Sequence, residues 1–361
     1  MGEFDEKEVN RSAVSSVHQE PSGRSTNDRD STGRIGGRQA AGEFREGAGV
    51  NQGCSVAGGA ESVGSVRRIE SAPGVRTSNG SIAGTSSVHG EKMGAGSGQK
   101  KGIRGMSHTM AVAQQKGGDG KTASVVHFGF DYFERGHRVA VVDLDTQGNA
   151  SHTLEHFASG YVASAMFSDS ADKLIAHFAN LPDGPLLSLI ASDKDLADME
   201  ELSFDEAAEC FKSNIEALAK AGFDVILIDN APSLGTTLAA SLYAADSVIS
   251  PIKPEYYSIM GIKKMLTVIA NVRKINTKLQ FLGMVPSMVD MRNPSHVQNL
   301  AELQEAYPSL MIPLSIGLRS SIADALADQM PVWKIKKTSA RKAAQEMRAL
   351  AAYAIEKMEI K

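Results

Sequence analysis

The stretch at 116–122 constrains this chain most, because its seven residues, K-G-G-D-G-K-T, combine three glycines with two lysines and a threonine. An apolar-leaning run at 110–113 precedes it, and apolar residues recur at helical spacing over 123–133. A strand, a glycine loop and a helix in this order are typical of a phosphate-binding loop. Glycines let backbone N–H groups converge on phosphate oxygens without Cβ clashes, and the helix directs the positive end of its dipole at them.

Each residue of this loop has an expected role. Lys121 is placed to reach the β- and γ-phosphates of a nucleotide, and the Thr122 hydroxyl to bind Mg²⁺. The ordinary pattern G-x-x-x-x-G-K-[ST] is not met, because Gln115 stands at its first glycine. The chain instead carries the deviant form K-G-G-x-x-K-[ST], with a second lysine at its head. The predicted nucleotide-binding residues are Lys116, Gly117, Gly118, Asp119, Gly120, Lys121 and Thr122.

Composition divides the chain into two unequal parts. Residues 1–105 hold 21 of the 34 glycines, 15 serines and only two aromatic residues. Such a segment cannot bury enough apolar surface to offset the entropy lost on ordering. We therefore predict a disordered, Gly/Ser-rich N-terminal tail over 1–105 and one P-loop ATPase domain over 106–361, with Met106 as a candidate internal translation start.

Charge, cysteine content and hydropathy limit the partners of the domain. Residues 106–361 carry 24 Lys and Arg against 30 Asp and Glu, so any nucleic-acid binding requires a local basic patch. Cys54 and Cys210 make neither a disulfide framework nor a metal site. No apolar run approaches the length of a membrane span, and the acidic start of the chain is unlike a signal peptide. We expect a cytoplasmic protein with no membrane partner.

Apolar strands and amphipathic helices alternate after the glycine loop. This alternation predicts an α/β fold with a mostly parallel, doubly wound sheet flanked by helices. Strands are expected at 137–145, 185–190, 223–229, 247–252, 279–289 and 310–316. Helices are expected at 148–157, 171–180, 203–222, 259–275, 294–307 and 339–358.

Acidic residues stand at the ends of two of the predicted strands. Asp143 and Asp145 close the strand at 137–145, and Asp229 closes the strand at 223–229. In open α/β sheets, ligands bind at the carboxyl ends of the strands. Asp229 fits the Walker B pattern, in which a buried strand brings a carboxylate to the Mg²⁺ held by the glycine loop.

With these residues together, the chain resembles the ParA family of deviant-Walker partition ATPases, and within it the partition proteins of IncP-type plasmids. The resemblance covers residues 106 to about 360. Its four ordered motifs are Q-K-G-G-D-G-K-T (115–122), V-V-D-L-D-T-Q-G-N-A-S (141–151), I-L-I-D-N-A-P-S-L-G (226–235) and P-I-K-P-E-Y-Y-S-I-M-G-I (251–262).

The resemblance implies an ATPase of plasmid partition, or DNA segregation, with ATP and Mg²⁺ as cofactors. It implies a homodimer that encloses ATP, non-specific binding to DNA, association with the nucleoid, and a ParB-type centromere-binding partner of the KorB kind. The implied catalytic residues are Lys116, which reaches the phosphates bound by the partner subunit, and Asp145, which positions the attacking water. The implied metal site consists of Thr122, Asp143 and Asp229, the last acting through a metal-bound water.

Three residues depart from the family pattern. Asp119 and Asn230 stand where the family has a small apolar residue and a threonine, and Thr146 replaces a proline. An acid inside a phosphate loop opposes an anionic ligand by on the order of 1 kcal/mol or more, so weak nucleotide affinity or slow turnover is expected. The alternative function is therefore a non-catalytic, nucleotide-dependent switch or co-repressor that assists a DNA-bound repressor.

A basic segment at 331–342, P-V-W-K-I-K-K-T-S-A-R-K, has five positive charges and no acid. It is either a solvated helix entrance or a non-specific DNA surface, and we favour DNA because phosphate contacts require clustered Lys and Arg but no particular sequence. The resemblance adds two arginines, although Gly317 stands where the family has its usual arginine. The predicted DNA-binding residues are Arg292, Arg319, Lys334, Lys336, Lys337, Arg341 and Lys342.

Two further patterns indicate other functions, a zinc site and membrane binding. The string H-T-L-E-H at 152–156 matches an inverted zinc-protease motif, but no downstream glutamate is identifiable as a third ligand. A membrane-associated ATPase related to MinD requires a C-terminal amphipathic helix, and 355–361 lacks bulky aromatic residues and a basic face. We expect neither a zinc site nor membrane binding.

Overall fold

The computed structural model describes residues 107–360. The predicted disordered tail and the candidate start at Met106 lie outside these residues. The described part forms a seven-stranded sheet in the order β3-β4-β2-β5-β1-β6-β7, and every pairing between neighbours is parallel. The strands are β1 (His108–Val112), β2 (Arg138–Leu144), β3 (Ala158–Val162), β4 (Leu186–Ala191), β5 (Val225–Asn230), β6 (Ser247–Ile252) and β7 (Gln280–Pro286).

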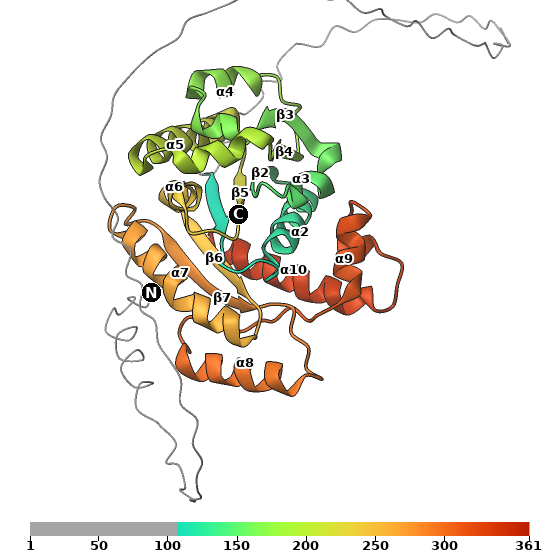
Figure 1. Cartoon of the computed structure of the whole chain (residues 1–361). Coiled ribbons are helices and arrows are strands. Elements are labelled where there is room, and N and C mark those ends of the chain that lie inside the picture. Colours follow the sequence, from blue (N-terminus) through green and yellow to red (C-terminus); the bar gives the residue numbers. More distant parts are fainter. Residues whose placement is uncertain (1–106, 361) are drawn as a thin grey trace, which may run out of the picture. The chain divides into compact units, whose positions relative to one another are not determined.

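Helices cover both faces of this sheet, with α4 to α7 on one face and α2, α3, α9 and α10 on the other (Figure 1). The helices are α2 (Lys121–Glu134), α3 (Asn149–Thr153), α4 (Ala171–His177), α5 (Phe204–Ala221), α6 (Thr236–Ala244), α7 (Tyr256–Arg273), α8 (Pro294–Ala306), α9 (Ser320–Ala327) and α10 (Ala340–Lys357). Short 3₁₀ helices include η3 (Lys194–Glu201) and η4 (Val332–Lys334). The predicted doubly wound α/β fold is confirmed.

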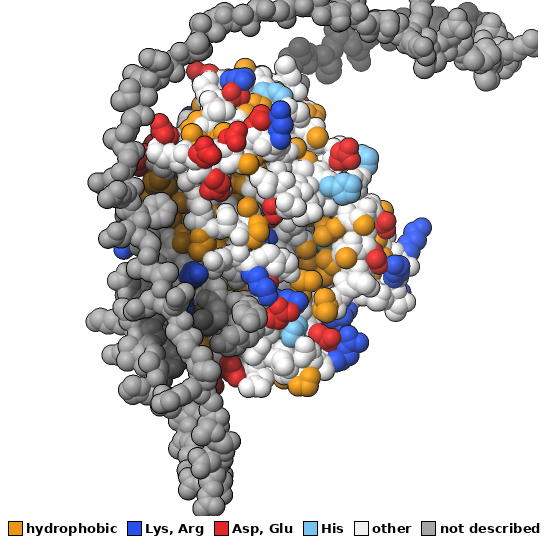
Figure 2. All heavy atoms as spheres, in the orientation of Figure 1, with side chains coloured by type: hydrophobic (Ala, Val, Ile, Leu, Met, Phe, Trp, Pro, Cys, Tyr) orange, Lys and Arg blue, Asp and Glu red, His pale blue; other side chains and the backbone are white. Residues whose placement is uncertain are grey.

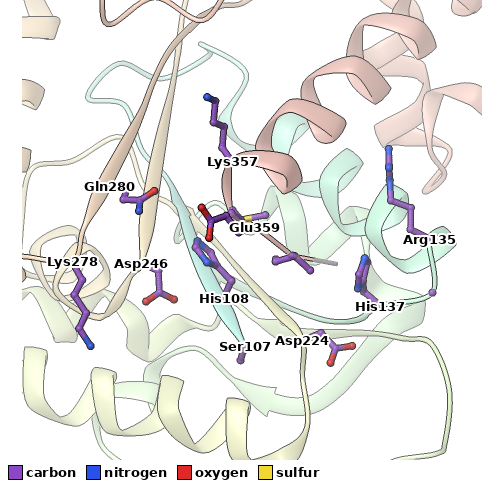
Figure 3. A pocket seen from close by; sticks show the side chains of 13 residues that line it. Ser107, His108, Arg135, His137, Asp224, Asp246, Lys278, Gln280, Lys357 and Glu359 are labelled. Carbon is purple, nitrogen blue, oxygen red and sulfur yellow. The ribbon is translucent and has the colours of Figure 1, made fainter. Parts of the chain in front are cut away.

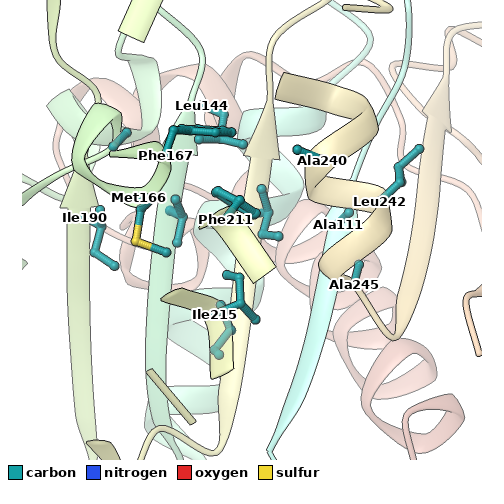
Figure 4. Close-up of a cluster of buried hydrophobic side chains, with 14 of the residues drawn as sticks. Ala111, Leu144, Met166, Phe167, Ile190, Phe211, Ile215, Ala240, Leu242 and Ala245 are labelled. Atoms are coloured by element: carbon teal, nitrogen blue, oxygen red, sulfur yellow. The ribbon is translucent and has the colours of Figure 1, made fainter. Parts of the chain in front are cut away.

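The two hydrophobic cores follow from the two-residue period of the strands. Along β1, Ala111 faces the core under α4 to α7, whereas Met110 and Val112 face the core under α2 and α10. Figure 4 shows the first of these cores, where Phe211 of α5 lies among side chains from the sheet and from the other helices. Because both faces of the central strands are buried, their sequences are apolar throughout, as a covered parallel sheet requires.

Strand register brings the predicted acids to one edge. Asp143 on β2 pairs with Asp229 on β5, and Asp229 pairs with Val112 on β1, directly before the glycine loop. The loop and both acids therefore lie at the carboxyl ends of the three adjacent central strands.

Some predicted elements are wrong. The expected strand at 310–316 contributes only a single bridge, Met284 to Met311, because the next donor of β7 in this register would be Pro286, which has no N–H to extend the ladder. The expected helix at 148–157 is only one turn of α3 followed by a 3₁₀ turn. The prediction missed β3, α6 and α9, which are only five, nine and eight residues long. Across 107–360, none of the helices has the length and apolar character needed to cross a bilayer.

Candidate nucleotide-binding site

The glycine loop runs from the end of β1 to the first residue of α2. Gly118 and Gly120 have φ values of 79° and 94°, in the left-handed region that favours glycine. A Cβ atom on Gly120 would also lie 2.5 Å from Oγ of Ser287. Gly120 is the N-cap of α2, no side chain caps this helix, and its first turn contains no acid. The N-terminal N–H groups of α2 are thus available to an anion.

Lys121 lies at the centre of the charges in this site. Its side chain is buried, and its ammonium donates a hydrogen bond to the carbonyl oxygen of Lys116 at 3.2 Å. Burial lowers the pKa of Lys121, while the carboxylates of Asp229, Asp145 and Asp119 oppose this shift. One lysine therefore faces three acids, so the site carries excess negative charge that a bound cation would compensate.

Asp229 has the least favourable surroundings for a charged carboxylate among these three acids. It is fully buried, and neither of its carboxylate oxygens has a hydrogen-bond partner of good geometry. Desolvation, followed by repulsion from Asp143, raises the pKa of Asp229 well above its usual range, although the Thr122 hydroxyl and Lys121 act in the opposite direction. A buried carboxylate without hydrogen bonds is a ready acceptor for a cation or for the water bound to one.

Asp143 and Asp145 have different surroundings. The Asp143 carboxylate accepts hydrogen bonds from the Ser151 backbone N–H (2.8 Å), the Ser151 hydroxyl (2.7 Å) and the Asp145 N–H (3.1 Å). Burial still raises the pKa of Asp143. Asp145 accepts only the N–H of Gln147, at 3.0 Å, and lines the cavity beside the loop. Asp145 is therefore the acid of this pair that faces a ligand.

These residues fit Mg²⁺ held together with a phosphate. Among residues 107–360, no group of three or more His, Cys, Asp or Glu side chains could hold a metal ion unaided. Mg²⁺ usually keeps several waters and binds one or two protein oxygens plus substrate phosphates, which matches the Thr122 hydroxyl beside the Asp229 carboxylate. Within the same residues the string H-T-L-E-H is therefore part of no such group, and His152 lies on the cavity wall described below.

A cavity of about 750 Å³ opens beside the loop. Gly117, Gly118, Lys121, Thr122 and Asp145 form one wall. A second wall, which the sequence analysis did not assign to this site, consists of residues from the end of β7 to α9. It includes Ser287, Met288, Ile316, Arg319 and Ile322. The signal available in the sequence was the polar Ser287 directly after a buried strand, whereas the left-handed φ of 52° at Met288 is visible only in the structure.

Asp119, the main departure from the family pattern, is buried. Its charge acts on Lys121, but less strongly than the charges of Asp229 and Asp145. The described lining of the cavity contains its neighbours Gly118 and Gly120 but not Asp119. The repulsion of a nucleotide by Asp119 stays a prediction, and we expect it to be weaker than the repulsion by an acid of the cavity lining would be.

Lys116 is the lysine at the head of the loop. Its ammonium donates to Glu255 at 2.6 Å, and Lys253 forms a second ion pair of 2.6 Å with the same carboxylate. Glu255 belongs to the motif P-I-K-P-E-Y-Y and immediately precedes α7, but the sequence analysis gave it no role. Lys116 thus starts from a contact with its own subunit.

The predicted DNA-binding residues fall into three places. Lys334, Lys336, Lys337, Arg341 and Lys342 are exposed and follow one another from η4 into the first turn of α10. Arg292 is exposed before α8 and pairs with Asp290 at 2.9 Å, while Arg319 lines the cavity beside the glycine loop and pairs with Glu346 at 2.6 Å. In Figure 2, acidic side chains gather over α4 and α5, whereas basic ones stand out beside α9.

His127 connects the loop helix to this basic segment. It is fully buried in α2, and its Nε2 accepts the N–H of Val332 at 3.2 Å, so Nδ1 donates to the carbonyl oxygen of Ala123 at 2.6 Å. Burial lowers its pKa to about 4, which keeps the ring neutral at physiological pH. The helix that begins at Lys121 is thereby joined to the start of η4.

A larger cavity, of about 970 Å³, lies at the other edge of the sheet, where the strands begin (Figure 3). Two of its carboxylates are already used by the fold, since Asp246 accepts the N–H of Thr109 and Asp224 accepts the N–H of Arg138, each at 2.8 Å. It has no glycine loop and no helix N-terminus lined by glycine. The smaller cavity is the better candidate for a nucleotide.

Comparisons with known proteins agree with this geometry. The family model described as an AAA domain matches residues 107–281. Protein IncC from Escherichia coli is 57% identical over 335 residues, covering 92% of each chain, and the chromosome partitioning protein ParA of Caulobacter vibrioides is 30% identical over 227 residues, covering 62% of this chain and 85% of its own. The structure of cobyrinic acid a,c-diamide synthase from Mycobacterium smegmatis with bound ADP and magnesium superposes with a TM-score of 0.53 at 28% identity, covering 70% of this chain and 96% of the other.

Proposed function

This chain belongs to the IncC group of the ParA-family partition ATPases, and from that premise we propose that it hydrolyses ATP to move plasmid DNA. In this proposal it dimerises around ATP, binds DNA without sequence preference, and acts with a ParB-type centromere-binding protein. The observation that carries the ATPase is the uncapped N-terminus of α2 beside Lys121 and the unsatisfied Asp229 carboxylate.

The residues divide the work of phosphoryl transfer. Water attacks the γ-phosphate of ATP, and Mg²⁺, when bound, would compensate the negative charge of the phosphate oxygens. The α2 N-terminus and Lys121 bind phosphate oxygens, and Thr122 with Asp229 would hold the metal and its water. Asp145, which has one backbone hydrogen bond and faces the cavity, orients the attacking water. Lys116 neutralises charge on the phosphates bound by the partner subunit.

DNA binding is proposed for the basic segment at 334–342. Among the described residues, Lys336 and Lys342 are exposed and have no ion pair, whereas Lys337 is held by Asp324 at 2.7 Å. The link from α2 through His127 to η4 supports a dependence of this surface on nucleotide. Arg319 is a weaker candidate than the sequence suggested, because Glu346 already occupies its guanidinium.

A test of this surface replaces Lys336, Lys337 and Lys342 together by alanine. Each phosphate contact adds about −0.9 to the slope of log affinity against log salt, so a dimer that loses four to six cations should show a slope shallower by about four to five. Fluorescence anisotropy with a random duplex at several salt concentrations measures it. An unchanged slope with intact ATP binding would place the DNA surface elsewhere.

The second candidate function is a nucleotide-dependent switch without turnover, and the acid at Asp119 beside Lys121 is the observation that favours it. Steady-state ATPase assays with and without DNA and the ParB-type partner separate the two. We expect slow turnover for the chain alone and a clear stimulation when both are present. ATP-dependent DNA binding with no turnover under any of these conditions would establish the switch instead.

A further inference from the structure

Glu255 lies between two lysines, one of which, Lys116, is the head of the glycine loop. Its Oε2 accepts from Lys116 Nζ and its Oε1 from Lys253 Nζ, both at 2.6 Å. The residue follows β6 and is the last residue before α7, so its backbone is fixed by a strand on one side and a helix on the other. A carboxylate anchored in this way holds the Lys116 ammonium against its own subunit.

The ion pair with Lys116 is present throughout the physiological pH range. Hydrogen bonds from Lys116, and then from Lys253, lower the pKa of Glu255 to about 2. The contact is also open to exchange, because the Lys116 and Glu255 side chains are 34% and 35% exposed. Both side chains therefore stay charged at physiological pH, but water or another anion can reach Lys116 and replace Glu255 as its partner.

We propose that Glu255 is a positioning residue that holds Lys116 in the single subunit and sets the threshold at which ATP drives dimerisation. The inference rests on the proposed function, in which the Lys116 ammonium leaves its own subunit to meet phosphates bound by the partner. Phosphate and the Glu255 carboxylate compete for the same ammonium. Dimerisation then requires that two such ion pairs be exchanged, one in each subunit.

The contacts around this pair make the exchange reversible. When Lys116 leaves, Lys253 remains on Glu255, so the carboxylate is not left without a partner. The Lys116 backbone stays in place, because its carbonyl oxygen accepts from Lys121 at 3.2 Å, and only the side chain has to swing. Removing one exposed ion pair changes an equilibrium by up to about five-fold, so removing two should change it by about ten-fold or somewhat more.

The test is Glu255→Gln, which keeps the shape of the side chain and removes its charge. Sedimentation of the full chain over a range of concentrations, with Mg²⁺ and a slowly hydrolysed ATP analogue, should give a dimer Kd about ten-fold lower than wild type. Glu305→Gln is the matched control, since Glu305 is an exposed glutamate of α8 outside the nucleotide cavity. The control should dimerise like wild type.

Glu255→Gln combined with Lys116→Ala shows whether the change in dimer Kd depends on Lys116. If Glu255 acts by holding Lys116, Glu255→Gln should change the dimer Kd by less than about two-fold in that background. A ten-fold gain that survives there means that Glu255 merely repels phosphate, and the inference is wrong. It is equally wrong if wild type dimerises with ATP and Glu255→Gln is unchanged or weaker, whereas a wild type that never dimerises with ATP overturns the proposed function itself.

Discussion

The two edges of the central sheet carry the same residue type with opposite consequences. At the edge where the strands begin, Asp224 and Asp246 each accept a backbone N–H at 2.8 Å and bind neighbouring strands together. At the edge where they end, Asp229 is buried with two oxygens that have no good hydrogen bond. A satisfied carboxylate stabilises the fold, whereas an unsatisfied one is held at a cost in stability that a bound cation can relieve.

The largest expected difference between the two edges is in the rate of ATP turnover. Asp145→Ala should lower ATP turnover by on the order of 10²–10⁴-fold, because the attacking water loses its carboxylate, and it should leave ATP binding intact. The variant should accumulate as an ATP-bound dimer, detectable by sedimentation beside a steady-state assay. Asp224→Ala, at the other edge, is the matched control and should turn over ATP like wild type; equal rates in the two variants would remove the distinction between the edges.

Nucleotide affinity is the next expected difference. Lys121→Ala should weaken ATP binding by about 100-fold or more, since a charge-assisted contact to phosphate is lost in a buried site. Lys278→Ala removes an equal charge from the cavity at the opposite edge and should leave the affinity unchanged. Titration calorimetry with ATP and Mg²⁺ measures both, and a loss of affinity in the Lys278 variant would move the nucleotide to the larger cavity.

Removing a carboxylate should change the free energy of unfolding in opposite directions at the two edges. Asp229→Asn removes a buried charge and should raise the free energy of unfolding by about 1–3 kcal/mol, whereas Asp224→Ala should lower it by about 1 kcal/mol. Denaturant titration without nucleotide measures both values. A destabilised Asp229→Asn variant would show that this carboxylate is satisfied by the fold.

The effect at Asp229 should also depend on pH. Because the folded pKa of Asp229 is raised, the folded state retains its proton after the unfolded chain has lost it. The corresponding stability is present below the ordinary Asp pKa of about 3.9 and is lost as pH rises toward the folded pKa. The advantage of Asp229→Asn over wild type should therefore grow with pH above about 4, and an advantage that stays flat between pH 4 and 8 would contradict this account.

The smallest expected effect concerns Asp119. Asp119→Val removes a buried negative charge that acts on Lys121, so ATP binding should tighten, by no more than about five-fold. Calorimetry on the variant and on Asp119→Asn, which keeps the size of the side chain, separates charge from shape. Unchanged affinity in both would mean that the acid has no influence on the phosphates.

The sequence by itself determined the edge of the sheet where the glycine loop and the strand-end acids meet. The glycine loop, Lys121, Thr122 and the strand-end acids are local patterns, because each depends on a strand that ends in a particular residue or on a glycine that permits a left-handed turn. Their positions in the chain were sufficient to predict that they meet. The regular strands around them were predictable because both of their faces are buried.

Only the tertiary structure decided which charges are paired. The Lys116–Glu255 contact joins residues 139 positions apart, and His127 meets Val332 across 205 positions, so no local period indicates either one. The same holds for the second wall of the cavity and for Arg319, whose guanidinium pairs with Glu346 at 2.6 Å, 27 positions further along the chain. Pairing of this kind depends on distance and solvent exposure, and these are fixed by how the helices pack on the sheet rather than by the order of residues along one helix or strand.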